Sequence, residues 1–286
     1  MPRKLIVEFT KMDGAGNDFI VIDNRFYNFS DDELADLARR FCPRRVGIGA
    51  DGVLAFARVA DEAHHYRMRY VNADGSVGTM CGNGARCLAR YARHAGLLDE
   101  TLLFESDAGI YRATAPPDPE APVRLFVPPP RHWNPDQMLA GSLPEPIDAA
   151  HYLWTGTEHL VCFVDDVAAT PVQAWGPAIR HDAALAPAGV NVDFVQILDE
   201  GHRRQPAALR VRTFEKGVEQ ETLACGTGAL ASALAARFLE RIQANTAQIH
   251  MPGGILGVGF ERNGEAVTGL YLEGPATTVY RGTIEV

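Results

Sequence analysis

Hydrophobic positions along the chain alternate in short runs, and this pattern predicts many strands and few helices. Two segments differ because their apolar residues recur at helical spacing. The first follows Cys81 and stops at Gly96, and the second begins at Cys225. A third helix is predicted over Asp31–Phe41, capped near Ser30. The predicted strands are Leu5–Thr10, Phe19–Asp23, Val53–Ala57, Tyr66–Val71, Leu102–Ser106, Val190–Leu198, Leu209–Phe214, Ile255–Phe260, Leu270–Glu273 and Thr277–Val286.

Glycine and proline mark the breaks between these elements. Glycine-rich turns are predicted at Met12–Asp18 and Val46–Gly52. The segment Ala115–Ala149 holds ten of the chain's 18 prolines, which predicts a crossover between domains near Pro128 and an extended surface segment after it.

Four segments of the first half recur in the second half, in the same order and at nearly the same offset. One of them is a cysteine followed by two glycines, and its two copies lie 144 residues apart. The four matched pairs are Cys81–Gly84 with Cys225–Gly228, Asn17–Asp23 with Glu158–Asp165, Ala50–Leu54 with Val192–Gln196, and Ser106–Gly109 with Met251–Gly254. We interpret the repeat as a tandem duplication.

The duplication predicts an α+β fold of two pseudo-symmetric domains, each a mixed, mostly antiparallel β-sheet, barrel-like, wrapped around a central α-helix. The first half is expected to span residues 1–128 and the second residues 129–276. The last predicted strand, residues 277–286, has no counterpart after Gly109 in the first copy. We therefore expect it to return and complete the sheet of the first half.

Composition narrows the function class. The chain has 286 residues, 47% of them hydrophobic, which suits two ordinary domains. A net charge of −9 without any basic run argues against nucleic acid or an anionic membrane as partner. No apolar stretch is long enough for a signal-peptide core or a membrane span. The five cysteines, with no Cys-x-x-Cys pair, indicate free thiols in the reducing cytoplasm and argue against a zinc site.

Each repeated cysteine precedes the first turn of a predicted helix. The unpaired N–H groups and the positive end of the helix dipole would stabilise a thiolate there, and the glycines would leave those N–H groups open to a carboxylate. A single such turn would more often hold a buried structural cysteine, but two equivalent turns favour chemistry. If the domains face one another, one thiolate can remove a Cα proton while the opposite thiol returns one. Two neighbouring anions repel, so one cysteine should stay protonated.

These motifs give the chain a resemblance to the diaminopimelate epimerases, a family of pyridoxal-independent amino-acid racemases and epimerases. It rests on KMDGAGNDF, GIGADG, NADG, CGNGAR, NVDF, FEKG, ETLACGTGA and EGPA in this order over nearly the full length. The resemblance implies interconversion of LL- and meso-diaminopimelate, in lysine and peptidoglycan-precursor biosynthesis. It implies a small amino-acid substrate, no cofactor and no metal. A homodimer is considered, although the sequence does not establish the oligomeric state.

The resemblance also implies roles for individual residues. Cys81 and Cys225 match the acid/base pair, and His159 and Glu215 match residues beside them. Taken alone, His159 and Glu215 would read equally well as ordinary, partly buried polar residues. The positions matched to substrate binding are Asn17, Asp51, Asn72, Gly82, Asn83, Thr157, Asn191, Glu215, Lys216, Gly226 and Thr227. Asp51 is a turn residue first and a substrate neighbour second, and Cys42, Cys87 and Cys162 are expected to be inert core residues.

Two departures from the family pattern concern the distal end of the substrate. The chain has Gly-Thr157-Glu158-His159 where the family commonly has Gly-Asn-Pro-His, and Lys216 where it commonly has Arg. Arginine holds a carboxylate with a two-pronged fork, whereas lysine offers a point charge on a flexible stem. Two alternatives therefore stay open. The same two-cysteine mechanism could act on another amino acid such as histidine, or the chain could be a non-catalytic amino-acid-binding or thiol redox protein.

Overall fold

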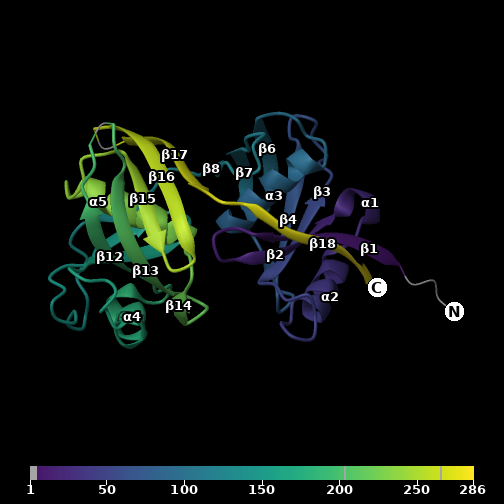
Figure 1. Ribbon diagram of the computed structural model, residues 1–286. Coiled ribbons are helices and arrows are strands. Elements are labelled where there is room, and N and C mark those ends of the chain that lie inside the picture. Colours follow the sequence, from purple (N-terminus) through teal and green to yellow (C-terminus); the bar gives the residue numbers. More distant parts are fainter. Residues whose placement is uncertain (1–4, 203, 265) are drawn as a thin grey trace. The chain divides into compact units, whose positions relative to one another are not determined.

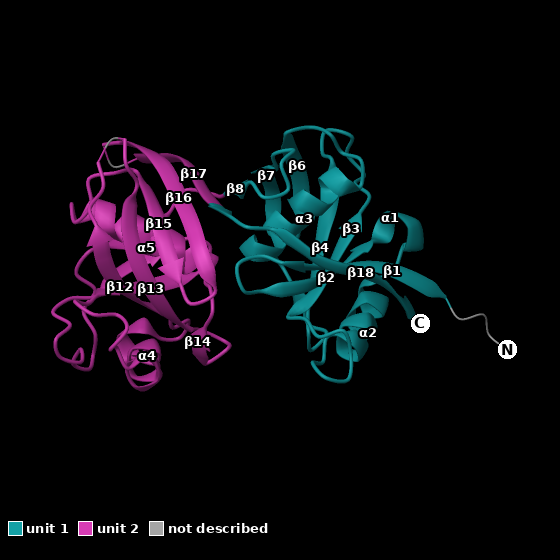
Figure 2. Ribbon diagram, viewed as in Figure 1, with its two compact units in different colours: residues 1–126, 273–286 teal, residues 127–272 magenta. Residues whose placement is uncertain are grey.

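The computed structural model describes residues 5–202, 204–264 and 266–286, and the chain divides into two compact units (Figures 1 and 2). Unit 1 comprises residues 1–126 and 273–286, and unit 2 comprises residues 127–272. Each unit combines several strands with few helices, so the predicted α+β class is confirmed. Within the described ranges, no helix is long and apolar enough to span a membrane.

The described strands of unit 1 pair mostly antiparallel, with parallel pairing at two places. Its elements are β1 (Ile6–Asp13), β2 (Asp18–Asp23), α1 (Asn24–Tyr27), α2 (Asp31–Phe41), β3 (Gly52–Ala57), β4 (Tyr66–Asn72), β5 (Val77–Gly78), α3 (Gly82–His94), β6 (Thr101–Ser106), β7 (Gly109–Thr114), β8 (Val123–Phe126) and β18 (Thr277–Glu285). The parallel pairs are β2 with β3 and β4 with β6. The C-terminal strand β18 pairs antiparallel with β1, from Ile6 opposite Glu285 to Asp13 opposite Thr277.

Unit 2 repeats this plan. Its elements are β9 (Arg131–Asn134), β10 (His151–Trp154), β11 (Glu158–Phe163), α4 (Val172–Arg180), the 3₁₀ turn η1 (Ala183–Leu185), β12 (Asn191–Asp199), β13 (Ala207–Glu215), β14 (Gln220–Thr222), α5 (Gly226–Phe238), β15 (Thr246–Met251), β16 (Gly254–Asn263) and most of β17 (Ala266–Gly274). The parallel pairs are β11 with β12 and β13 with β15, at the places of β2 with β3 and β4 with β6. The shared order of pairings confirms the pseudo-symmetry that the sequence predicts.

The helix that follows each repeated cysteine is the buried helix of its unit. In α5 every residue from Gly228 to Ala236 is buried, and the helix packs against β10–β13, β15 and β16. Its alanines keep the helix slim enough for strands to approach on several sides. Helix α3 is buried in the same way against β2, β3, β4, β7 and β8, but its buried face includes Arg86 and Arg90.

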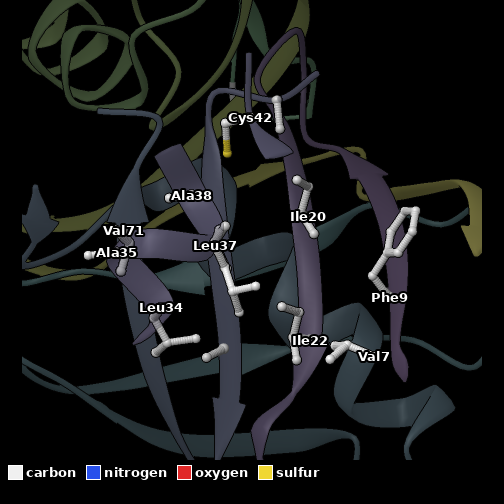
Figure 3. Packing of buried hydrophobic residues seen from close by; sticks show 13 residues of the cluster. Val7, Phe9, Ile20, Ile22, Leu34, Ala35, Leu37, Ala38, Cys42 and Val71 are labelled. Carbon is white, nitrogen blue, oxygen red and sulfur yellow. The ribbon is translucent and has the colours of Figure 1, made fainter. Parts of the chain in front are cut away.

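A second layer of core packs against a second helix in each unit, α2 in unit 1 and α4 in unit 2. In unit 1 the apolar face of α2, with Leu34, Leu37 and Ala38, packs on Ile20 and Ile22 of β2 (Figure 3). Helix α2 has the predicted bounds, and Ser30 caps it with a reciprocal bond to Glu33. In unit 2 α4 packs in the same manner against β12 and β13.

The sequence-based prediction was wrong in several segments. Strand β9 lies in the extended surface segment predicted after Pro128, β7 and β8 lie where no strand was predicted, and β1 continues into the predicted turn as far as Asp13. Strand β7 was missed because only Ala113 among its residues is buried, so it shows little alternation. Helix α4 was missed because Gly176 and Pro177 lie inside it, and both residues disfavour helix interiors.

Gly176 is required by close packing between α4 and β13. A Cβ atom at this position would lie 2.4 Å from Cγ of Phe214. Gly176→Ala is therefore expected to lower the free energy of unfolding by about 1–3 kcal/mol, because overpacking outweighs the gain in helix propensity. Urea unfolding measures this effect. Gln173→Ala, on the exposed face of the same helix, is the control and should change stability by less than about 0.5 kcal/mol. An unchanged midpoint for Gly176→Ala would contradict the packing argument.

Candidate functional site

The two repeated cysteines take the same place in their units. Cys81 is the N-cap of α3, and Cys225 is the N-cap of α5, both with extended backbone angles. The Sγ atom of Cys81 accepts a hydrogen bond from Gly84 N at 3.4 Å, so the thiol caps its own helix. Cys225 is 7% exposed, and its Sγ lies 3.5 Å from Oγ1 of Thr227. Both sulfur atoms therefore lie where a helix dipole favours negative charge.

The third residue after each cysteine is a glycine that lies close to a strand. A Cβ on Gly84 would lie 3.0 Å from Cδ2 of Leu54, and a Cβ on Gly228 would lie 2.4 Å from Oδ1 of Asp193. The sequence explained these glycines by ligand access to the helix N–H groups. The structure adds a packing reason, which is independent of any ligand.

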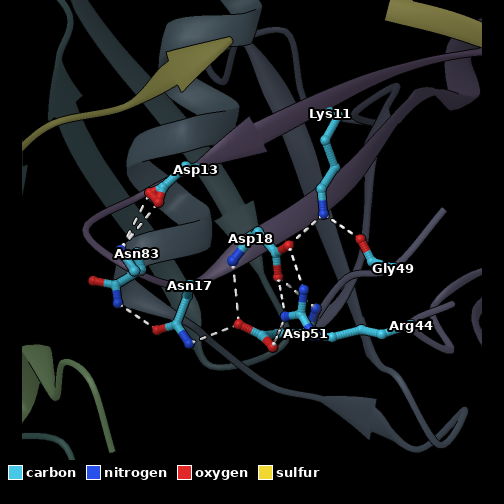
Figure 4. Close-up of polar contacts among 9 residues, drawn as sticks. Lys11, Asp13, Asn17, Asp18, Arg44, Gly49, Asp51 and Asn83 are labelled. Carbon is cyan, nitrogen blue, oxygen red and sulfur yellow. Dashed lines mark hydrogen bonds and ion pairs between the residues drawn. The ribbon is translucent and has the colours of Figure 1, made fainter. Parts of the chain in front are cut away.

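In unit 1 the predicted substrate residues Asn17, Asn83 and Asp51 form one hydrogen-bonded chain (Figure 4). Asn83 Nδ2 donates to Asn17 Oδ1 at 2.6 Å, and Asn17 Nδ2 donates to Asp51 Oδ2 at 3.0 Å. Asn83 follows Gly82 in the first turn of α3, and Asn17 lies in the turn between β1 and β2. The chain thus connects the Cys81 turn to the loop that precedes β3.

Asp51 belongs to a balanced group of charges. Its carboxylate also accepts from Arg44 Nη2 at 2.9 Å and from the backbone N–H of Asp18 at 3.1 Å. Asp18 in turn pairs with Arg44 and Lys11 (Figure 4). Burial alone would raise the pKa of Asp18, but these two cations hold it below its usual range. Because protein donors occupy Asp51, the structural role ranked first for it is favoured over contact with substrate.

Asn72 stands apart from this chain. It ends β4 and pairs in register with Gly52, while its side chain accepts from Tyr70 Oη at 2.6 Å and donates to Ser76 Oγ at 3.0 Å. Asn72 therefore lies near the same strand end as Asp51, but its side chain bonds to Tyr70 of its own strand and to Ser76 of the turn that follows.

In unit 2 a buried carboxylate orients His159. His159 and Asp193 are both 0% exposed, and His159 Nδ1 lies 2.7 Å from Asp193 Oδ2. The second oxygen of Asp193 accepts from Thr213 Oγ1 at 2.7 Å. Since a carboxylate in this position accepts the Nδ1 proton, the lone pair of His159 lies on Nε2 when the ring is neutral.

Asn191 joins three strand ends in unit 2. We call the polar residues around each repeated cysteine a half-site, one around Cys81 and one around Cys225. Its Nδ2 donates to the Glu158 carbonyl at 3.1 Å and lies 3.4 Å from His159 Nε2, and its Oδ1 accepts from Lys216 N at 2.8 Å. The parallel register, with His159 opposite Asn191, brings these residues together although they are far apart in sequence.

Two carboxylates, Glu215 and Asp193, act on Cys225. Burial raises the pKa of Glu215, which ends β13. Burial also raises the pKa of the Cys225 thiol well above its usual value, and the nearby charges of Glu215 and Asp193 raise it further. The largest of these effects favour the protonated thiol of Cys225.

The departures from the family pattern lie side by side. Lys216 Nζ forms an ion pair with Glu158 Oε2, and Thr157 Oγ1 donates to the same oxygen at 3.1 Å. This cluster adjoins the Cys225 turn, because Thr155 Oγ1 donates to the Thr227 carbonyl at 2.9 Å. Lysine, glutamate and threonine thus form one polar group at the edge of the half-site.

Sequence reasoning missed three charged residues of these half-sites: Arg86, Glu158 and Asp193. Asp193 could have been found because it lies two residues after Asn191, on the same face of a strand. Arg86 could have been found as a charged residue at an apolar position of a helix. No signal in the sequence pairs Glu158 with Lys216.

The remaining cysteines, Cys42, Cys87 and Cys162, are buried, in keeping with the expected core positions. Burial raises the pKa of Cys42 and of Cys162 to about 12, and it raises that of Cys87 even further. Within residues 5–202, 204–264 and 266–286, no three His, Cys, Asp or Glu side chains are grouped to hold a metal ion.

Several solved structures share the fold. A phenazine biosynthesis protein of the PhzF family from Bacillus anthracis matches with a TM-score of 0.73 at 17% identity, covering 99% of this chain and 100% of that one. A hydroxyproline epimerase from Agrobacterium vitis matches with a TM-score of 0.67 at 17% identity, covering 100% of this chain and 93% of that one. At such low identity the likeness concerns the fold alone.

Sequence comparison is more specific. The sequence profile of the family described as diaminopimelate epimerase matches residues 9–125 and 151–279. The diaminopimelate epimerase of Chlorobaculum tepidum is 41% identical over 276 residues, covering 96% of this chain and 99% of the relative. That of Methanocella arvoryzae is 41% identical over 288 residues, covering 98% and 97%. The chain therefore belongs to the diaminopimelate epimerase family.

Proposed function

We propose that this chain interconverts LL- and meso-diaminopimelate without a cofactor or metal, as an isomerase of lysine and peptidoglycan-precursor biosynthesis. One observation carries the proposal: in a member of this family, a cysteine caps each of two topologically equivalent buried helices. Each unit therefore supplies one cysteine sulfur at the start of its buried helix. The proposed reaction needs both sulfur atoms.

The proposed reaction is a proton exchange at one carbon. A thiolate takes the Cα proton, so that a C–H bond breaks and an S–H bond forms, and the electron pair left on carbon spreads into the α-carboxylate. The opposite thiol then gives its proton to the other face of the carbon. The N–H groups at Gly82, Asn83, Gly226 and Thr227 would stabilise the carboxylate charge. His159 and Glu215 would lie beside Cys225, where Asp193 orients the imidazole.

The proposal is tested by incubating the full chain with LL-diaminopimelate in deuterium oxide. We expect the meso isomer to form and deuterium to appear at Cα, and histidine and other amino acids in the same panel should react far more slowly. Absence of exchange with every diaminopimelate isomer would overturn the proposal. Tight binding without exchange would instead favour an amino-acid-binding protein.

A second candidate keeps the mechanism and changes the substrate to another amino acid. The observation behind it is the ion pair of Lys216 with Glu158, which leaves Lys216 less free to bind a distal carboxylate. We favour diaminopimelate because its distal end carries both an ammonium and a carboxylate. Glu158 could contact the ammonium and Lys216 the carboxylate, since both side chains stay partly exposed, at 26% and 24%.

Lys216→Met is expected to lower kcat/KM for diaminopimelate by about 10- to 100-fold, because a hydrogen bond to a charged group contributes about 1.5–3 kcal/mol. The measurement is the rate of Cα exchange with diaminopimelate and with lysine, which lacks the distal carboxylate. Lys216→Arg is the control and should keep most of the activity. Equal losses for the two substrates would show that Lys216 does not read the distal carboxylate.

The free thiols favour a cytoplasmic enzyme, in keeping with its proposed place in biosynthesis. The homodimer stays a prediction, and sedimentation of the purified chain would test it.

A further inference from the structure

Helix α3 carries a fully buried arginine next to the turn that presents Cys81. Arg86 is 0% exposed. Its Nη2 donates to Asn83 Oδ1 at 2.9 Å and to the Gly14 carbonyl at 3.2 Å, and its Nη1 donates to the Gly82 carbonyl at 3.5 Å. None of these acceptors is charged, and Nε has no hydrogen-bond partner. Among the described residues, no carboxylate lies within ion-pair distance of this guanidinium.

A buried cation without a carboxylate partner is costly, and the shared fold does not require one here. Arg86 lies five residues after Cys81. The residue five positions after Cys225 in the equivalent helix α5 is Leu230, an apolar side chain that is 1% exposed. The same fold is therefore built with leucine at this place in unit 2.

Unit 2 has negative charges at strand positions where unit 1 has uncharged residues. Leu54 of β3 faces Gly84, and Asp193 of β12 faces Gly228 at the equivalent place. By the same strand registers, Glu215 at the end of β13 takes the place of Asn72 at the end of β4. Unit 2 thus has two carboxylates where unit 1 has leucine and an amide.

The charged groups described near Arg86 do not pair with it directly. Asp13, at the end of β1, acts on Arg86 only at longer range and accepts from Gly16 N. Cys87 is a buried thiol whose pKa burial raises strongly, so it stays neutral. The charged cluster that Asn17 contacts is neutral as a whole. In it the carboxylates of Asp18 and Asp51 pair with two cations, Lys11 and Arg44 (Figure 4).

The charged groups around Cys225 have a net negative charge. Glu215 and Asp193 both act against a thiolate there. His159 contacts Asp193, and even a protonated His159 would balance only one of the two carboxylates. The neighbouring pair of Lys216 with Glu158 is neutral as a whole.

We propose that Arg86 is a positioning residue that makes Cys81 the thiolate of the resting enzyme, while Asp193 and Glu215 keep Cys225 a thiol. The inference deepens the proposed function, because it assigns the starting protonation of the same two cysteines. The positive charge of Arg86 stabilises the Cys81 thiolate, and its bonds to Gly82 and Asn83 fix the turn that carries it.

Arg86 also sets the direction of the amide chain. Since it donates to Asn83 Oδ1, the Nδ2 of Asn83 must face Asn17, and Asn17 must then aim its own Nδ2 at Asp51 (Figure 4). A cation at one end and a carboxylate at the other leave each amide only one orientation.

The test measures thiol ionisation and needs no substrate. The reduced full chain is alkylated with iodoacetamide over a range of pH, and the peptides that contain Cys81 and Cys225 are quantified by mass spectrometry. Only the thiolate reacts, so the pH midpoint of each rate profile reports ionisation independently of how exposed each thiol is. We expect the Cys81 midpoint to lie at least about one pH unit below that of Cys225.

Arg86→Met should raise the Cys81 midpoint by about one pH unit, a tenfold loss of thiolate at lower pH, and leave Cys225 unchanged. Arg86→Lys keeps the charge and should stay closer to wild type. The matched control is Arg90→Met, one turn further along α3. Arg90 is 2% exposed and donates to the carbonyls of Pro116 and Ala121, so its loss should disturb packing without moving the Cys81 midpoint.

A wild-type Cys225 midpoint at or below that of Cys81 would overturn the inference, and this comparison needs no variant to fold. So would a folded Arg86→Met with an unshifted Cys81 profile, or a shift of the same size in Arg90→Met. If Arg86→Met does not fold, Arg86→Lys and the wild-type profiles decide. Because alkylation proceeds without diaminopimelate, this result is separate from success or failure of the exchange assay.

Discussion

Cys225→Ser is expected to lower kcat for epimerisation by about 10³-fold, and Cys81→Ser should do the same. A serine hydroxyl does not ionise near neutral pH, so it neither removes nor returns a Cα proton as a thiol does. Both cysteines occupy the N-cap position of a buried helix, and serine is a good N-cap residue, so the fold should persist. Inversion is measured by formation of the second isomer, and proton removal by deuterium incorporation at Cα.

The two readouts separate the roles of the sulfur atoms. Inversion needs both cysteines, whereas removal of a proton needs only a thiolate. If Cys81 is the resting thiolate, Cys225→Ser should lose inversion more completely than exchange. Cys162→Ala is the matched control, since it removes a buried thiol from β11 of unit 2, and it should leave kcat within about twofold. Retention of a tenth or more of wild-type inversion by either serine variant would contradict the two-thiol mechanism.

The features that the sequence predicted well are local. The Cys81 and Cys225 turns combine a cysteine, two glycines and an apolar helix within a few residues, so the two helix starts could be predicted without tertiary contacts. Helix α2 was predicted to the residue because Ser30 and Glu33 form a capping box at its start. The duplication was visible because these local signals recur at one offset.

The missed features depend on strand register or on packing between elements. His159 and Asp193 meet only because β11 and β12 run parallel with His159 opposite Asn191, a register that no local pattern encodes. The ion pair of Glu158 with Lys216 needs the ends of two strands to converge. The low helix propensity of Gly176 disfavours a helix in the sequence, although this glycine is the residue that lets α4 pack on β13. The residues that differ in charge between the half-sites were hidden for the same reason.

Asp193→Ala is expected to lower the free energy of unfolding by about 3–5 kcal/mol, the cost of breaking a buried pair by removing one partner. His159 and Thr213 would each lose their bond to Asp193 in a site with no exposure to water. The kcat for epimerisation should also fall by about 100-fold, since an unheld imidazole can rotate or change tautomer. Urea unfolding and Cα exchange measure the two effects.

Asp193→Asn separates the charge of this residue from its hydrogen bonds. The asparagine amide can still accept from His159 through oxygen and donate through nitrogen to a rotated Thr213 hydroxyl, so stability should fall by only about 1 kcal/mol. Its lost charge should still matter, because Asp193 raises the pKa of Cys225, and the pH profile of kcat should shift toward lower pH. Glutamate is not a suitable rescue, since Gly228 packs against the carboxylate and leaves no room for a longer side chain. If Asp193→Asn retains both the wild-type kcat and the wild-type pH profile, Asp193 acts only through packing, and the charge difference between the half-sites has no part in catalysis.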